Sequence, residues 1–185
     1  CLSIISHIFA SMTTLENERR SYYERWRHRE MPKDPEKSNS FLTIGKEFQK
    51  LNDDESAYRA LQSAIRFNSD NAEAHLLLAK ISFREKRFRR AERHLSAAKK
   101  LDPKNSDVWA IYGMLLNREE SGYVRNVKDS TECLQKALKL GIADKEREKA
   151  TMGLVGINLR ELKKNTESLK IFQKLNKNFN FNKDK

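Results

Sequence analysis

The stretch AEAHLLLAKISFREKRFRRAERHLSAAKKLDPKN, residues 72–105, decides the fold of this chain. Its apolar residues recur at helical spacing in two runs, one around Leu78 and one through Ala91 and Leu95, which predicts two helices joined by a turn. Pro103 then closes the unit, because a proline at the start of the next helix loses no backbone hydrogen bond. The stretch is therefore expected to form one helical hairpin.

The same pattern occurs 34 residues earlier, with Gly45 in place of Ala79 and Ala57 in place of Ala91. Small residues at these positions let the two helices of a hairpin approach closely. A period of 34 residues in paired helices is typical of the tetratricopeptide repeat, and the chain resembles that family from about Ser38 to its C-terminus. The resemblance implies an all-α fold, an α-solenoid of about four hairpins preceded by an N-terminal helix.

The repeat register divides the chain into segments. The third hairpin carries an inserted loop, residues 119–128, because its second helix comes five residues later than the strict period predicts. This loop is either neutral variation, since loop length costs little entropy, or a partner-specific contact. The expected segments are an apolar N-terminal stub or lipid tether (1–11), a helix and linker (12–37), four repeats (38–71, 72–105, 106–141 and 145–178) and a tail (179–185).

The segment before the repeats has two interpretations. Residues 14–30 are predicted to form a helix whose Tyr22 and Trp26 pack on the first hairpin, or bind a partner or a membrane surface. Cys1 resembles the lipid-bearing first cysteine of bacterial lipoproteins, and the alternative is an ordinary fragment. Lipidation of Cys1 would place the protein at the outer membrane, facing the periplasm; the alternative is the cytoplasm.

Composition supports a helical, non-catalytic protein. The chain has only three prolines and six glycines, no sustained strand pattern, and a net charge of +11. That charge permits contact with nucleic acid, anionic lipid or an acidic protein segment, but it also suits a solvated basic surface. The histidines lack metal-ligand spacing, His75 is interpreted as a core histidine, and no cofactor, metal or catalytic residue is predicted.

The repeat register also predicts a binding surface. The first helix of each hairpin lines the concave face in this family, and apolar and basic residues alternate at the positions that face it. Such a groove suits an acidic or amphipathic segment of a partner protein, although basic residues could coincide there by chance. The predicted groove residues are Leu42, Lys46, Gln49, Lys50, Leu76, Lys80, Phe83, Arg84, Met114, Asn117, Arg118, Ile157 and Arg160.

The resemblance bears on function in two ways. Tetratricopeptide domains that clamp the C-terminal carboxylate of chaperones use a Lys/Asn/Asn/Lys/Arg set, and the matching positions here hold Leu42, Lys46, Leu77, Asp107 and Ile111, so that clamp is not expected. The stretch AERHLSAAKKLDPKNSDVWAIYGMLL, residues 91–116, resembles the pilotin-like tetratricopeptide lipoproteins that assist type IV pilus secretins.

The sequence therefore predicts a protein-binding scaffold. In its narrower form this is an envelope-anchored assembly factor for a pilus, secretion or motility machine. The alternatives are a cytoplasmic co-chaperone or adaptor and an RNA-binding helical repeat protein, whose affinity would fall steeply with salt. An enzyme is not expected.

Overall fold

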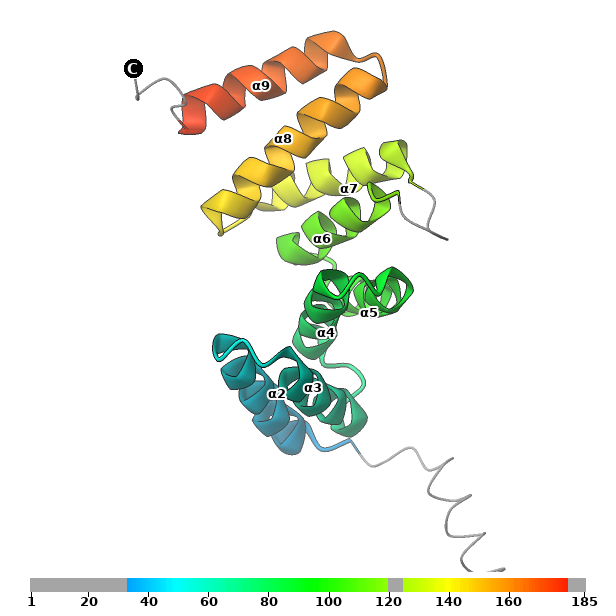
Figure 1. Ribbon diagram of the computed structural model, residues 1–185, viewed down its shortest axis with the longest axis vertical. Coiled ribbons are helices and arrows are strands. Elements are labelled where there is room, and N and C mark those ends of the chain that lie inside the picture. Colours follow the sequence, from blue (N-terminus) through cyan, green and yellow to red (C-terminus); the bar gives the residue numbers. More distant parts are fainter. Residues whose placement is uncertain (1–32, 120–124, 180–185) are drawn as a thin grey trace, which may run out of the picture. The chain divides into compact units, whose positions relative to one another are not determined.

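The computed structural model describes residues 33–119 and 125–179. The chain divides into two compact units, Cys1–Lys33 and Asp34–Lys185, and every described helix belongs to the second. The described residues form helices without strands (Figure 1), as the sequence predicts. The helices are α2 (Pro35–Lys50), α3 (Asp54–Phe67), α4 (Ala72–Arg84), α5 (Phe88–Leu101), α6 (Ser106–Leu116), α7 (Val127–Leu140), α8 (Lys145–Glu161) and α9 (Asn165–Phe179).

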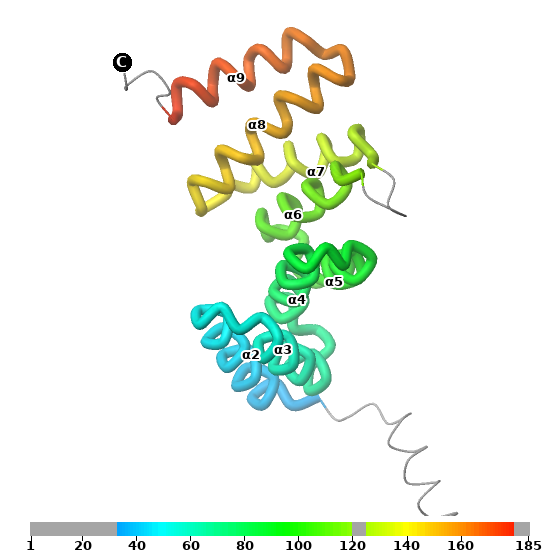
Figure 2. Tube along the Cα trace, viewed as in Figure 1, coloured from blue at the N-terminus to red at the C-terminus, as the bar shows by residue number. Residues whose placement is uncertain are grey.

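Consecutive helices pack in pairs: α2 with α3, α4 with α5, α6 with α7, and α8 with α9. Smaller interfaces join α3 to α4, α5 to α6 and α7 to α8, so each hairpin packs on the next one along the chain. The trace in Figure 2 follows this order from α2 to α9. The fold of the described residues is thus an all-α array of paired hairpins, a tetratricopeptide-like solenoid.

Polar side chains at the turns determine where the helices begin. Asp34, Asp53, Asn71, Asn105 and Asn126 each accept a hydrogen bond from a backbone N–H in the first turn of the helix that follows, which satisfies a donor that has no partner inside the helix. Asp144 does the same for α8, whereas Arg87 before α5 makes no such hydrogen bond.

Three boundaries differ from the expected ones. α2 begins at Pro35 within the predicted linker, because Asp34 caps the helix and Pro35 occupies its first position, where a missing N–H is harmless. α7 begins at Val127, inside the predicted loop, because Asn126 caps it. α9 also continues to Phe179, the first residue of the predicted tail. The predictions for the stub, the N-terminal helix, Cys1 and residues 180–185 lie outside the described residues.

Glycines in the first helix of a hairpin allow the second helix to pack closely. A Cβ added to Gly45 would lie 2.7 Å from Leu61 Cγ, and one added to Gly113 would lie 2.6 Å from Leu134 Cγ. Gly45 and Gly113 are two repeat periods apart, with Ala79 midway between them. The small residues of the sequence pattern are thus explained by contacts between paired helices.

The hydrophobic clusters extend beyond single hairpins. One cluster combines Leu42 of α2 and Leu61 of α3 with Leu78 and Ile81 of α4. Another combines Leu76 of α4 and residues of α5 with residues of α6. Because the first helix of each hairpin completes the core of the preceding one, successive hairpins are held by burial of apolar side chains.

Candidate binding groove

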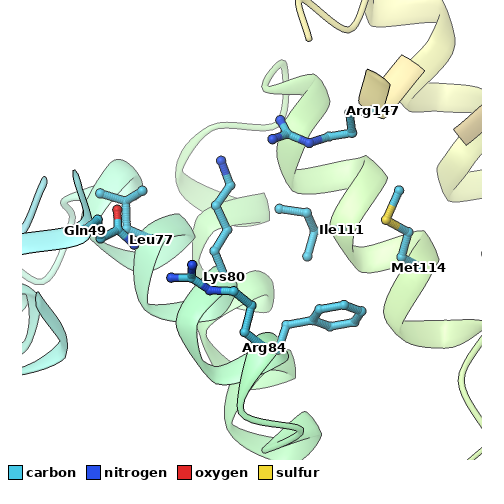
Figure 3. Close-up of a pocket in the computed structure, with 8 residues that line it drawn as sticks. Gln49, Leu77, Lys80, Arg84, Ile111, Met114 and Arg147 are labelled. Carbon is cyan, nitrogen blue, oxygen red and sulfur yellow. The ribbon is translucent and has the colours of Figure 1, made fainter. Parts of the chain in front are cut away.

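Two adjoining clefts lie along the first helices of the hairpins. The first has a volume of about 460 Å³ and the second about 520 Å³, and both are lined by Phe83 of α4 and Met114 of α6, so they form one continuous groove. Figure 3 shows the first cleft, with Lys80 and Arg84 from α4, Ile111 and Met114 from α6, and Arg147 from α8 around it. The other lining residues are Gln49 and Leu77 in the first cleft, and Asn117, Arg118, Ala150, Gly153, Leu154 and Ile157 in the second.

A ladder of ion pairs joins the first helices of neighbouring hairpins. Lys46 Nζ of α2 lies 2.7 Å from Glu73 Oε1 of α4, and Lys80 Nζ of α4 lies 3.0 Å from Asp107 Oδ2 of α6. The two pairs are one repeat period apart at both ends. Asp107 also accepts a hydrogen bond from Arg147 of α8, so one carboxylate binds cations from two other helices.

The electrostatics of Asp107 reflect these two partners. Burial of the carboxyl group opposes its ionisation, but the hydrogen bonds and positive charges of Lys80 and Arg147 outweigh burial and lower the pKa of Asp107. The side chains of all three residues are only about a quarter exposed, at 25% for Asp107 and 28% for Lys80 and Arg147. We therefore assign this triad a structural role in the floor of the groove.

Other cations of the groove are more available to a partner. Arg84 pairs with Asp54 at 2.6 Å, but the Arg84 side chain is 51% exposed. Exposed ion pairs contribute about 0–1 kcal/mol, so Arg84 can exchange Asp54 for a carboxylate of a partner at little cost. Arg118 is exposed and its guanidinium carbon lies 5.3 Å from the centroid of the Phe83 ring. Arg118 forms no ion pair with any described residue.

The apolar side chains of the groove pack on the hydrophobic clusters of the hairpins. Phe83 packs edge to face on Phe88 of α5, with ring centroids 5.8 Å apart, and both contact the cluster shared by α4, α5 and α6. Met114 packs on the cluster around Leu134. Since the Phe83 and Met114 side chains are only half-buried, their outer surfaces remain available for contact with an apolar ligand group.

Arg125, which immediately precedes the capping residue of α7, contacts a residue of the second cleft. Arg125 donates hydrogen bonds to Asn117 Oδ1 at 3.2 Å and to Glu161 Oε1 of α8 at 3.0 Å. It thereby links the C-terminal ends of α6 and α8. Its first partner, Asn117, lines the second cleft, so Arg125 holds one of the residues that form the cleft.

The predicted groove residues fall into three groups. Leu42 and Leu76 are 8% and 5% exposed and lie in the hydrophobic clusters, because they face the neighbouring helices. Lys46, Lys50 and Arg160 lie outside the two clefts, with Lys46 and Lys50 paired to glutamates. The structure brings together the remaining eight: Gln49, Lys80, Phe83, Arg84, Met114, Asn117, Arg118 and Ile157.

Six lining residues were absent from the predicted set. Leu77 and Ile111 occupy positions that match the chaperone clamp of the family, which is a signal that these positions face the groove. The predicted set contains Leu76 instead of Leu77, and consecutive residues of an α-helix point about 100° apart around its axis. Arg147 lies in the first turn of α8, which begins at Lys145, and the predicted groove residues of that helix, Ile157 and Arg160, lie farther along it. The other three are Ala150, Gly153 and Leu154.

His75 and His94 form a pair between α4 and α5, with their Nδ1 atoms 3.2 Å apart. Burial lowers the pKa of both side chains, and the neighbouring His75 helps to bring that of His94 to about 4. Both rings are half-buried. No group of three or more His, Cys, Asp or Glu side chains suited to a metal occurs within residues 33–119 and 125–179.

None of the described helices is both long enough and apolar enough to cross a membrane. Burial raises the pKa of the half-buried Cys133 thiol, the one cysteine among the described residues, which lowers its reactivity at neutral pH.

Comparisons with known proteins agree with this architecture. Residues 52–115 match the sequence model of the tetratricopeptide repeat family. No match was found among curated protein sequences.

Solved structures share the fold at low sequence identity. YrrB, described as a tetratricopeptide repeat protein with an unusual peptide-binding site, is 17% identical with a TM-score of 0.65, over 84% of this chain and 73% of its own. MamA is 19% identical with a TM-score of 0.62, over 77% of this chain and 78% of its own. The pilF protein of Pseudomonas aeruginosa is 20% identical with a TM-score of 0.61, over 77% of this chain and 61% of its own. The repeat match covers residues 52–115, and the paired helices on either side of it share the fold of these solved structures.

Proposed function

We propose that this protein is a non-catalytic scaffold that binds a segment of a partner protein in the groove between α4, α6 and α8. The observation that carries the proposal is the groove itself, in which half-buried Phe83 and Met114 lie beside the exposed cations Arg84 and Arg118. Apolar side chains offer area for burial, and cations offer steering and charge-assisted hydrogen bonds. Together they suit a segment that carries both apolar and acidic residues.

The location of the groove also supports a binding role. Its walls come from the first helices of successive hairpins, which are held by the ion-pair ladder and by the hydrophobic clusters. A surface held in this way is largely formed before the ligand arrives, which reduces the entropy lost on binding. YrrB, which shares the fold, is described as having a peptide-binding site.

The test uses short peptides. The full chain would be immobilised and used to select binders from a displayed library of random peptides, and the selected sequences would be synthesised. We expect them to combine acidic with bulky apolar residues. Their affinity for the wild type would then be compared with that for the double variant Arg84→Gln/Arg118→Gln.

A matched control changes the same amount of charge elsewhere. Lys170 and Lys174 lie exposed on α9, outside both clefts, so Lys170→Gln/Lys174→Gln lowers the net charge equally. Each charge-assisted hydrogen bond contributes about 1.5–3 kcal/mol, so the groove variant should bind at least about tenfold more weakly and the α9 variant within about twofold of wild type. Equal loss in both variants, or no selected peptide, would refute the groove as the binding surface.

The narrower proposal is that the protein is an envelope-anchored assembly factor for a pilus, secretion or motility machine. The observation behind it is the fold shared with pilF. Its test is fractionation of cells that produce the complete gene product, with metabolic labelling by a palmitate analogue. Lipid label in the membrane fraction that disappears in Cys1→Ser supports an anchor, and unlabelled protein in the soluble fraction contradicts it.

A further inference from the structure

One glycine of the groove is not explained by contacts with residues 33–119 or 125–179. Gly45, Gly113 and Gly156 each lie against a side chain of the paired helix, closer than a Cβ would permit. Gly153 differs, because a Cβ built on it meets no described atom within 4 Å apart from its two chain neighbours and the backbone of its own helix. It lies inside α8, where glycine is among the least favourable residues, and its φ is not in the left-handed region that favours glycine.

Gly153 lies at the wall of the second cleft. Ala150, one turn earlier on the same helix, is a second small residue and is exposed. Both Ala150 and Gly153 line the cleft. Ile157, one turn later, is 40% exposed, and Phe83 and Met114 line the cleft from α4 and α6. The absence of a side chain at residue 153 therefore leaves an open space with apolar groups around it.

The cleft is large enough for more than one group of a ligand. Its volume of about 520 Å³ lies within the range of roughly 300–1,000 Å³ found for ligand pockets. A space lined by aromatic, aliphatic and thioether groups favours an apolar side chain, because such a side chain leaves water without stranding a polar group.

Charge defines a second feature of the ligand. Arg118 is the cation that lines this cleft, and its described contact is with the face of Phe83. A guanidinium in this position can keep its contact with the ring while it donates hydrogen bonds to a carboxylate. The acidic residue of the ligand is therefore expected to be near the apolar one.

We propose that the space beside Gly153 receives one bulky apolar side chain of the partner segment, next to an acidic residue that binds Arg118. The occupant is an acidic, apolar peptide segment of another protein. This inference rests on the proposed function and assigns the specificity of the groove to one position, since any side chain at residue 153 would project into the space that the ligand needs.

The test fills the space while preserving the fold. Gly153→Ala and Gly153→Leu place progressively larger side chains in an open region of a helix, so both variants should melt at or above the wild-type temperature. The probe is a peptide selected on wild type from the random library. Binding to Gly153→Leu should be at least tenfold weaker, and binding to Gly153→Ala should be intermediate. Wild-type affinity of the Leu variant overturns the inference.

A double-mutant cycle tests the assignment independently of stability. Replacing the principal apolar residue of the peptide by alanine should weaken binding to wild type strongly but have little further effect on Gly153→Leu, where the space is already filled. Additive losses would overturn the inference, because they would place that residue elsewhere.

The outcomes also separate this inference from the proposed function. If Arg84→Gln/Arg118→Gln weakens peptide binding and Gly153→Leu does not, the groove binds peptides but the space beside Gly153 is not used. If neither variant weakens binding, both proposals fail. Gly156→Ala serves as a stability control on the same helix, because its Cβ would lie 2.7 Å from the Phe172 ring. It should lower the melting temperature without filling the groove.

Discussion

Replacement of Asp107 by asparagine should destabilise the protein much more than the equivalent replacement one repeat earlier, Glu73→Gln. Asp107 and Glu73 both occupy the second position of a first helix, and each pairs with a lysine of the preceding first helix. The helix-dipole contribution of about 0.3–1 kcal/mol is therefore lost in both variants and cancels in the comparison.

The difference comes from burial and from the number of partners. Glu73 and Lys46 are 52% and 40% exposed, and an exposed pair contributes about 0–1 kcal/mol. Asp107 is 25% exposed and binds both Lys80 and Arg147, and its removal leaves two partly buried cations without their carboxylate. Complete burial would cost about 3–5 kcal/mol, and we discount this to about 2–3 kcal/mol for Asp107→Asn because the site retains contact with solvent.

The assay is urea unfolding followed by far-ultraviolet circular dichroism, at low and high salt. We expect a loss of about 2–3 kcal/mol for Asp107→Asn that persists at high salt, and of about 1 kcal/mol or less for Glu73→Gln that becomes smaller with salt. Equal losses for the two variants would refute the reasoning, because they would mean that Asp107 does not hold α4 and α8 together.

Three further predictions concern stability. Gly113→Ala should lower the free energy of unfolding in urea by about 1–2 kcal/mol, because the added Cβ would lie 2.6 Å from Leu134 Cγ and this overpacking outweighs the gain in helix propensity. Unchanged stability would show that the paired helices are not in close contact. Thr151→Val should raise stability by about 1 kcal/mol, because the buried hydroxyl has no hydrogen-bond partner among the described residues and the two side chains have similar shapes. A loss of stability would mean that the hydroxyl does form a hydrogen bond. Stability should also fall as pH decreases from about 6.5 towards 4, because the pKa of His94 in the folded protein is lowered to about 4 and the unfolded chain therefore binds the proton first. One pKa unit corresponds to about 1.4 kcal/mol, and the partial exposure of His94 reduces the expected total to about 1–2 kcal/mol. In His94→Gln this part of the pH dependence should be much smaller, and an identical pH profile in the variant would contradict the assignment.

The fold was predictable because local patterns agree with the tertiary packing. The 34-residue spacing of Gly45, Ala79 and Gly113 marks positions where paired helices pack closely, as the glycine contacts show, and the apolar residues that recur with them form the clusters. Such contacts join residues that are close in the sequence, either within one hairpin or between neighbouring hairpins, so the repeat pattern predicts most of them.

The groove was less predictable, because it depends on which residues of neighbouring helices meet. A one-residue error in register placed Leu76 on the groove, although it packs in the core. The pairing of Lys80 with Asp107 was not predicted either, although the repeated interval between Lys46 and Glu73 and between Lys80 and Asp107 is visible in the sequence. Arg147 reaches Asp107 from 40 residues away, across the inserted loop, where the period no longer applies.

Amide chemical-shift mapping of a library-selected peptide on the isotope-labelled chain tests the central claim most directly. The account predicts that the largest shifts lie on α4, α6 and α8 around Phe83, Met114 and Gly153, with smaller effects on α5 and α7. Shifts concentrated on the second helices of the hairpins, or spread evenly over the chain, would contradict it.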